Sequence, residues 1–129
     1  MSLDKEKAEQ ELKEKMQNVK REDIQKVLRE KEKIEEKFKG SGPLGKYLAS
    51  VKVFFSLIKD YFNDEYTEVP WWTIAAIVTA LLYVFSPIDL IPDVIPGIGL
   101  VDDALVIAAC LTMVEQDLEN YKQWKMKNL

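Results

Sequence analysis

The chain has 129 residues with a formal net charge of −4, a single cysteine (Cys110) and no histidine. This length suits one domain that can bury a core without disulfides, and a lone cysteine cannot form an internal one. The absence of histidine removes the commonest general base and the commonest transition-metal ligand. Because the first residues are charged and lack an apolar stretch, we expect no cleavable secretory signal.

Charge is distributed unevenly along the chain. Residues 1–59 hold fifteen Lys or Arg and eleven Asp or Glu, whereas residues 60–121 hold eleven acids and no base. The last eight residues add three lysines. This segregation favours different environments along the molecule. Nucleic acid is not an expected partner, because the bases of the first segment alternate with nearly as many acids.

Residues 1–39 are predicted to form a charged helical arm, followed by a linker at residues 40–43 and a compact helical domain at 44–129. The arm is rich in Lys, Glu and Gln, which favour helix, but its sparse apolar residues drift away from a heptad repeat. We therefore expect a mostly solvated helix, broken near residues 20–23. The alternative is a helix that docks onto a partner or mediates homo-oligomerisation.

Residues 44–62 have the clearest amphipathic pattern in the chain. Apolar residues recur at spacings of three and four through almost five turns, and the opposite face carries Lys46, Lys52 and Lys59. A wide apolar face opposite lysines fits a bundle helix, and it fits a helix lying in a membrane interface equally well.

Residues 71–85 form an uncharged apolar run that begins directly after Pro70, a residue suited to a helix start. A helix of this length spans about 22 Å, which is shorter than the hydrocarbon layer of about 30 Å. A second apolar segment begins near residue 101 and becomes amphipathic toward 124. The prediction is an all-α bundle in which helices at about 70–85 and 101–124 form an apolar hairpin. The hairpin is expected to be a buried core, a re-entrant limb or a transmembrane helix.

Aromatic residues mark one end of this predicted hairpin. Trp71 and Trp72 open the first limb, and Tyr121 and Trp124 close the second. If the segment between the limbs reverses the chain, all four side chains lie at the same end, with Lys59 and Lys122. Aromatic residues and lysines at one level are typical of a membrane interface.

The segment between the limbs, residues 86–103, reads SPIDLIPDVIPGIGLVDD. Ser86, Pro87 and Asp89 match a helix-capping pattern, and Pro92 and Pro96 break the helix again. Asp102 and Asp103 are expected in the first turn of the next helix, where carboxylates meet backbone N–H groups. Two alternatives remain open: a Mg²⁺ or Ca²⁺ site, or a proton shared between two acids. The candidate metal ligands are Asp89, Asp93, Asp102 and Asp103.

The same segment closely resembles the YkvA-like family, known as domain of unknown function 1232. The resemblance rests on a Ser-Pro-x-Asp-x-Ile-Pro-Asp-x-Ile-Pro-x-x-Gly pattern followed by paired aspartates, matched here from Ser86 to Asp103. It covers about residues 44–125. The resemblance implies a small α-helical domain that is often regarded as membrane-associated and has no established activity.

The sequence therefore predicts a membrane-associated helical domain that acts as an anchor or interaction module, with its N-terminal arm in the cytoplasm. Its expected partner is a membrane lipid or a membrane protein. One alternative is a soluble, cytoplasmic helical domain that binds partners. The other is a carboxylate-rich cation site or hydrolase at the aspartate segment. No catalytic constellation and no cofactor-binding motif is recognisable.

Overall fold

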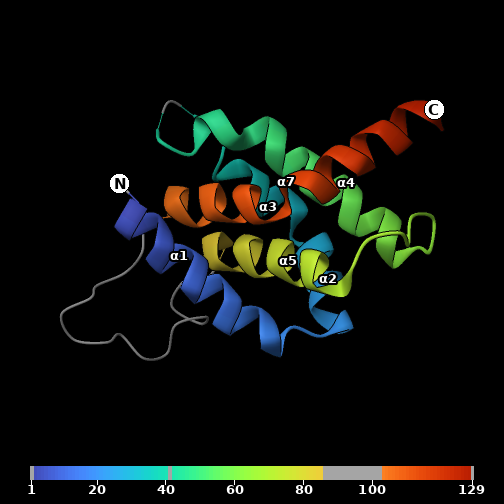
Figure 1. The fold of residues 1–129 in the computed structure, drawn as a ribbon. Helices are drawn as coiled ribbons and strands as arrows, with labels where there is room; N and C mark the ends of the chain where they lie inside the picture. The colour runs from blue at the N-terminus through green and yellow to red at the C-terminus, as the bar shows by residue number, and fades with distance from the viewer. Residues whose placement is uncertain (1, 41, 86–102, 129) are drawn as a thin grey trace.

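The structure, a computed structural model, describes residues 2–40, 42–85 and 103–128. These residues form six α-helices and two short 3₁₀ turns and contain no strand, which confirms the all-α prediction. Figure 1 shows their arrangement. In chain order the elements are α1 (Ser2–Lys15), η1 (Met16–Asn18), α2 (Arg21–Arg29), α3 (Lys31–Glu36), η2 (Gly45–Tyr47), α4 (Leu48–Phe62), α5 (Trp71–Phe85) and α7 (Asp103–Lys127).

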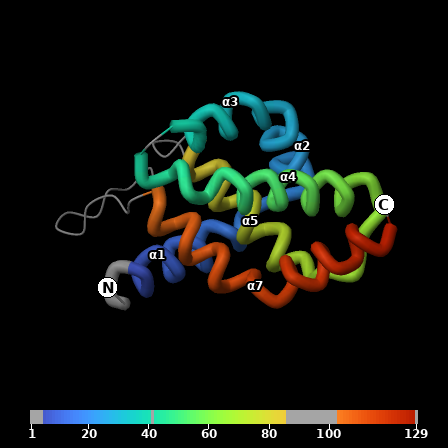
Figure 2. Tube along the Cα trace, turned by 90° about the horizontal axis from the view of Figure 1, so that it is seen from above, coloured from blue at the N-terminus to red at the C-terminus, as the bar shows by residue number. Residues whose placement is uncertain are grey.

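Helix α5 is the centre of the bundle. It contacts each of the other five described α-helices, and its side chains from Thr73 to Val84 are all buried. Figure 2 shows α1 and α7 alongside each other on one side of α5, with α2 and α3 on the other. A helix that is apolar all round is expected to be enclosed in this way. Of the placements expected for this segment, the structure thus has the buried core.

Helices α5 and α7 run antiparallel and pack together, as the predicted hairpin requires (Figure 1). A hydrogen bond fixes their register: Thr73 Oγ1 donates to Asp117 Oδ2 at 2.5 Å. The described helices include none with both the length and the apolar character to cross a bilayer. The expectation of a transmembrane helix is therefore not supported, because α5 is too short and α7 becomes charged beyond Val114.

The N-terminal segment differs from the expected solvated arm. Its apolar side chains belong to the same core as α4, α5 and α7, and six of them are almost fully buried. These are Ala8, Leu12, Ile24, Val27, Ile34 and Phe38. The expected break near residues 20–23 is present, because α1 and η1 end at Asn18 and α2 begins at Arg21. The division into residues 1–39, 40–43 and 44–129 stays a prediction.

Basic residues of this segment also stabilise the ends of other helices. The guanidinium of Arg21 lies 4.6 Å from the Phe62 ring centroid and donates to the Phe62 carbonyl at 2.8 Å. Lys37 Nζ donates to the carbonyls of Val84 at 2.9 Å and Phe85 at 3.3 Å. These carbonyls lie at helix C-termini, where cations are favourable. The charged segment therefore caps α4 and α5.

We expect Lys37→Met to lower the free energy of unfolding by about 1 kcal/mol, because two terminal carbonyls of α5 lose a charged donor. Urea unfolding followed by circular dichroism measures the change. Lys39→Met is the matched control, since within the described part of the chain Lys39 pairs only with the exposed Glu36 at 3.7 Å. Equal effects of the two substitutions would contradict the capping role.

The turn before η2 depends on glycine at two positions. Gly40 has a φ of +148°, a conformation that other residues rarely adopt. A Cβ at Gly45 would lie 2.4 Å from the Gly40 carbonyl oxygen, which is closer than any tolerated contact. Gly40 is therefore required for its backbone conformation and Gly45 for its close approach to the Gly40 carbonyl, and together they lead the chain into α4.

Candidate functional site

Three of the four candidate metal ligands, Asp89, Asp93 and Asp102, lie outside the described residues. The fourth, Asp103, is half-buried in the first turn of α7, where a carboxylate is expected to favour the helix. Among residues 2–40, 42–85 and 103–128, no group of His, Cys, Asp and Glu is arranged to hold a metal ion. Whether the aspartate segment binds Mg²⁺ or Ca²⁺ stays a prediction.

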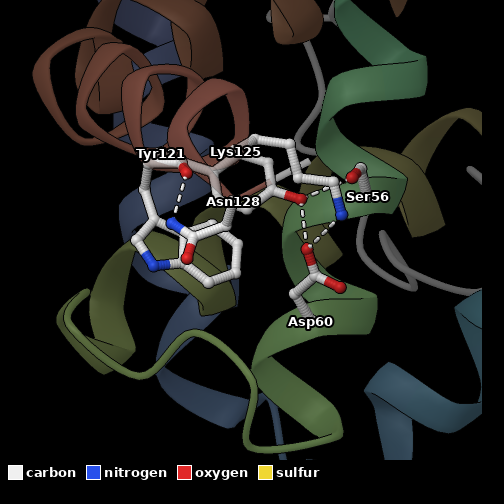
Figure 3. A network of polar contacts seen from close by, with 6 residues as sticks. Ser56, Asp60, Tyr121, Lys125 and Asn128 are labelled. Carbon is white, nitrogen blue, oxygen red and sulfur yellow. Dashed lines mark hydrogen bonds and ion pairs between the residues drawn. The ribbon is translucent and has the colours of Figure 1, made fainter.

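A buried polar network joins α4 to the C-terminal half of α7 (Figure 3). Asp60 is only 5% exposed although it is an acid in an otherwise apolar helix face. Its Oδ2 accepts from Tyr121 Oη at 2.5 Å and from Lys125 Nζ at 3.0 Å. Ser56, one turn before Asp60, bonds to the Tyr121 hydroxyl. A carboxylate buried in this way needs such partners.

The direction of the protons in this network follows from its geometry. Tyr121 has a single hydroxyl proton, and it donates that proton to Asp60. Ser56 must therefore donate to the tyrosine oxygen, since the Tyr121 proton is already used. The chain of bonds runs from Ser56 through Tyr121 to Asp60, with the Lys125 ammonium supplying the compensating charge. The network has a fixed polarity and holds the α4–α7 pair in one register.

Aromatic rings enclose the Tyr121 side of the network. The ring centroids of Tyr66 and Tyr121 lie 5.1 Å apart, and those of Tyr66 and Trp124 lie 4.8 Å apart. The Tyr121 and Trp124 rings are stacked at 5.9 Å. Burial raises the pKa of the Tyr121 phenol above its usual range, and the bond to Asp60 adds to the rise. Tyr121 therefore stays neutral as a donor and is not a poised acid or base.

The raised pKa of Tyr121 predicts a loss of stability in alkali. The unfolded chain releases this proton near pH 10, while the folded chain keeps it. The stabilisation is therefore complete below about pH 10 and is lost as the pH rises above it, by up to about 1.4 kcal/mol per pH unit. Urea unfolding at a series of alkaline pH values should give a shallower decline for Tyr121→Phe than for the wild-type chain. If the free energy of unfolding declined equally with pH in the two chains, the raised pKa of Tyr121 would be contradicted.

An open pocket of about 400 Å³ lies beside the network, between α2, α3, α4 and the end of α7. Four lysines line it, together with the carboxylates of Glu35 and Asp60. The lysines come from three different helices: Lys31 from α3, Lys52 and Lys59 from α4, and Lys125 from α7. A second, more apolar hollow of about 420 Å³ shares Lys52, Ser56 and Lys125 with it and extends to Val53 and Met126. The arrangement can attract an anion that carries an apolar portion.

The expected cluster of aromatic residues at one end of the hairpin is only partly exposed. Tyr121 is 1% exposed and belongs to the core, and Trp124 is half-buried against Tyr66 and Tyr121. Trp71 and Trp72, in the first turn of α5, are 39% and 42% exposed. The Trp71 ring packs against the Tyr61 ring at a centroid distance of 6.2 Å. Two adjacent exposed tryptophans thus lie where the buried helix begins.

Comparison with known proteins places this architecture in a family. The family model for a protein of unknown function (DUF1232) matches residues 73–109. The chain is also 33% identical over 82 residues to the uncharacterized membrane protein YkvA of Bacillus subtilis (strain 168). That match covers 64% of this chain and 77% of the relative. The chain belongs to the YkvA-like DUF1232 family. No solved structure matches it.

The segment that matches the DUF1232 family model covers most of α5 and only the beginning of α7. The matched range runs from Thr73 in α5 to Ala109 in α7 and so includes the aspartate segment. Ser56, Asp60, Tyr121 and Lys125 lie outside that range. The polar network and the lysine-lined pocket are therefore features of this chain beyond the family-defining segment.

Cys110, the residue directly after the matched range, is fully buried in α7. Burial raises the pKa of its thiol well above its usual range, so it stays protonated and unreactive in the folded chain. The structure places it among the core residues, as a small apolar side chain.

Asp60 was not among the residues predicted from the sequence to form a site. One signal was available: it is an acid inside the apolar stripe of residues 44–62, next to Tyr61 and two residues after Ile58. A charge at such a position requires a partner, and that partner is 61 residues away in α7. Spacing within one helix cannot reveal such a pairing.

Proposed function

We propose that this protein is a peripheral membrane-associated helical domain that contacts the bilayer through Trp71 and Trp72. The observation that carries the proposal is the exposure of these two adjacent rings, 39% and 42%, at the start of a helix that is otherwise buried. Tryptophan is enriched at the level of lipid headgroups, where its ring is apolar and its N–H remains hydrated. The Bacillus subtilis relative, an uncharacterized membrane protein by name, supports the same function.

The exposed rings account for binding that is reversible. About 40% of each tryptophan surface, roughly 100 Å² per ring, contributes about 2.5 kcal/mol on transfer out of water. Two rings together give a membrane affinity comparable to that of a single myristoyl chain, whose binding constant is about 10⁴ M⁻¹. In this proposal α5 stays inside the bundle and only its first turn meets the headgroups. The lysine-rich residues 1–39, which pack on α5, then lie on the same side of the bilayer as the rest of the bundle, the cytoplasmic side.

Tryptophan fluorescence tests the proposal directly, because the chain has only three tryptophans. On addition of phosphatidylcholine vesicles we expect a blue shift of the emission and co-sedimentation with the lipid. Trp71→Ala/Trp72→Ala should abolish both, because it removes the exposed pair. Trp124→Phe is the matched control and should keep the shift, since Trp124 packs on Tyr66 and Tyr121. Unchanged sedimentation of the double variant would overturn the proposal.

A further inference from the structure

We propose that the lysine-lined pocket between α3, α4 and α7 binds a phosphate ester group, with the apolar part of the ligand lying in the adjoining hollow. This inference goes beyond the proposed membrane contact, because it uses different side chains. The volume of the lysine-lined pocket, about 400 Å³, falls within the range of roughly 300–1,000 Å³ found for small-molecule sites.

The charge of the pocket favours an anion. Four lysines line it against two carboxylates, which leaves an excess of two positive charges. The Asp60 carboxylate is already occupied by the Lys125 ammonium and by the Tyr121 hydroxyl. Glu35 lies 4.0 Å from Lys31, at the limit of an ion pair. In the described part of the chain neither Lys52 nor Lys59 has an ion-pair partner.

Lys52 and Lys59 are placed to act together. They are seven residues apart on α4, which puts them two turns apart, about 10 Å, on the same face. Ser56 lies between them, but its hydroxyl proton is directed to Tyr121. The two ammonium groups therefore supply the free donors. Lysine is a common phosphate ligand, and a phosphate offers oxygens to several ammonium groups at once.

The neighbouring hollow accounts for the rest of the ligand. Val53, the Tyr121 ring and Met126 line it, and Met126 is 75% exposed. It shares Lys52 and Lys125 with the lysine-lined pocket, so one molecule can occupy both. An apolar chain beside a phosphate is the chemistry of a phospholipid, and a soluble phosphate ester has the same headgroup. The two sources differ in whether the phosphate is carried by a bilayer.

The experiment compares these sources with the full-length chain. Calorimetry at about 0.05 M salt, where surface charges are only weakly screened, measures binding of glycerol 3-phosphate. Sedimentation compares pure phosphatidylcholine vesicles with vesicles containing about 20% phosphatidic acid, an anionic lipid. The variant is Lys52→Gln/Lys59→Gln. The matched control, Lys13→Gln/Lys39→Gln, removes the same charge from exposed positions away from the pocket. Circular dichroism melting verifies that both variants fold.

We expect saturable binding of glycerol 3-phosphate or of the phosphatidic acid vesicles. The affinity should weaken at least tenfold in Lys52→Gln/Lys59→Gln and less than twofold in the control. Binding of glycerol 3-phosphate identifies a soluble ester as a sufficient ligand. Stronger binding to the phosphatidic acid vesicles that depends on Lys52 and Lys59, without binding of glycerol 3-phosphate, identifies the lipid as the source. Absence of both, or equal weakening in the control, would overturn the inference. Failure of the proposed tryptophan contact can be distinguished from failure of the phosphate site, because only the former abolishes binding to pure phosphatidylcholine vesicles.

Discussion

A chain that lacks residues 1–39 is expected not to reach the native fold. The deletion removes six almost fully buried apolar side chains and uncovers the faces of α5 that α1, α2 and α3 enclose. Each large side chain contributes about 1.5–3 kcal/mol, so the loss is comparable to the whole stability of a small domain, about 5–15 kcal/mol. We expect an aggregated or loosely packed product without a cooperative melting transition. A monomeric fragment with cooperative unfolding would contradict the enclosed position of α5.

A point substitution tests the same packing in a chain that still folds. Leu12 is 2% exposed in α1, and we expect Leu12→Ala to lower the free energy of unfolding by about 2–4 kcal/mol. Lys13→Ala is the adjacent control on the exposed face and should change stability by less than about 0.5 kcal/mol. Urea unfolding measures both. If Leu12→Ala behaves like the control, α1 is not part of the core.

The second large effect is expected at Asp60. Asp60→Ala removes the acceptor of both Tyr121 and Lys125 and should lower the free energy of unfolding by about 2–3 kcal/mol. The loss stays below that of a fully buried pair, because Lys125 is 44% exposed and can be hydrated again. Glu65→Ala is the control, an exposed acid in the segment just after α4. Equal unfolding curves for the two variants would contradict a structural role for the network.

The central hairpin was predictable because its signal is local. Fifteen uncharged residues after Pro70, a breaker-rich segment and a second apolar run indicated two helices that return on one another. The structure has them as α5 and α7, and the hydrogen bond from Thr73 to Asp117 fixes their register. Most of the breaker-rich segment, with three of the candidate metal ligands, lies outside the described residues.

The burial of the N-terminal segment was not predicted, because its apolar spacing was compared with a single heptad repeat although a break near residues 20–23 was expected. The backbone restarts twice, between Asn18 and Arg21 and again at Glu30, where φ is −98° and ψ is 17°. Each restart resets the phase of the apolar face. Ile24 and Val27 therefore face the core from α2, while Ile34 faces it from α3. A spacing that looks irregular along one helix thus reflects short helices that each turn their own apolar side chains toward the core.

The candidate site was less predictable than the fold for a physical reason. Asp60 and Tyr121 lie on different helices, and the four lysines of the pocket come from three. Sequence patterns report which face of a helix is apolar, but the pairing of polar groups across helices depends on how those helices pack. Lys52 and Lys59 were visible on the polar face of residues 44–62. Their convergence with Lys31 and Lys125 required the structure.

Extraction of membranes from cells expressing the full chain most directly tests the central claim, that the protein attaches to the bilayer from outside while α5 remains in the bundle core. The membrane pellet is washed with alkaline carbonate, which strips peripheral proteins, and the protein is followed by immunoblotting. We expect the protein in the membrane fraction before the wash and in the supernatant after it. Retention in the washed pellet would mean that its helices insert into the bilayer, and absence from the membrane fraction would mean that it does not bind. Either result would contradict the account.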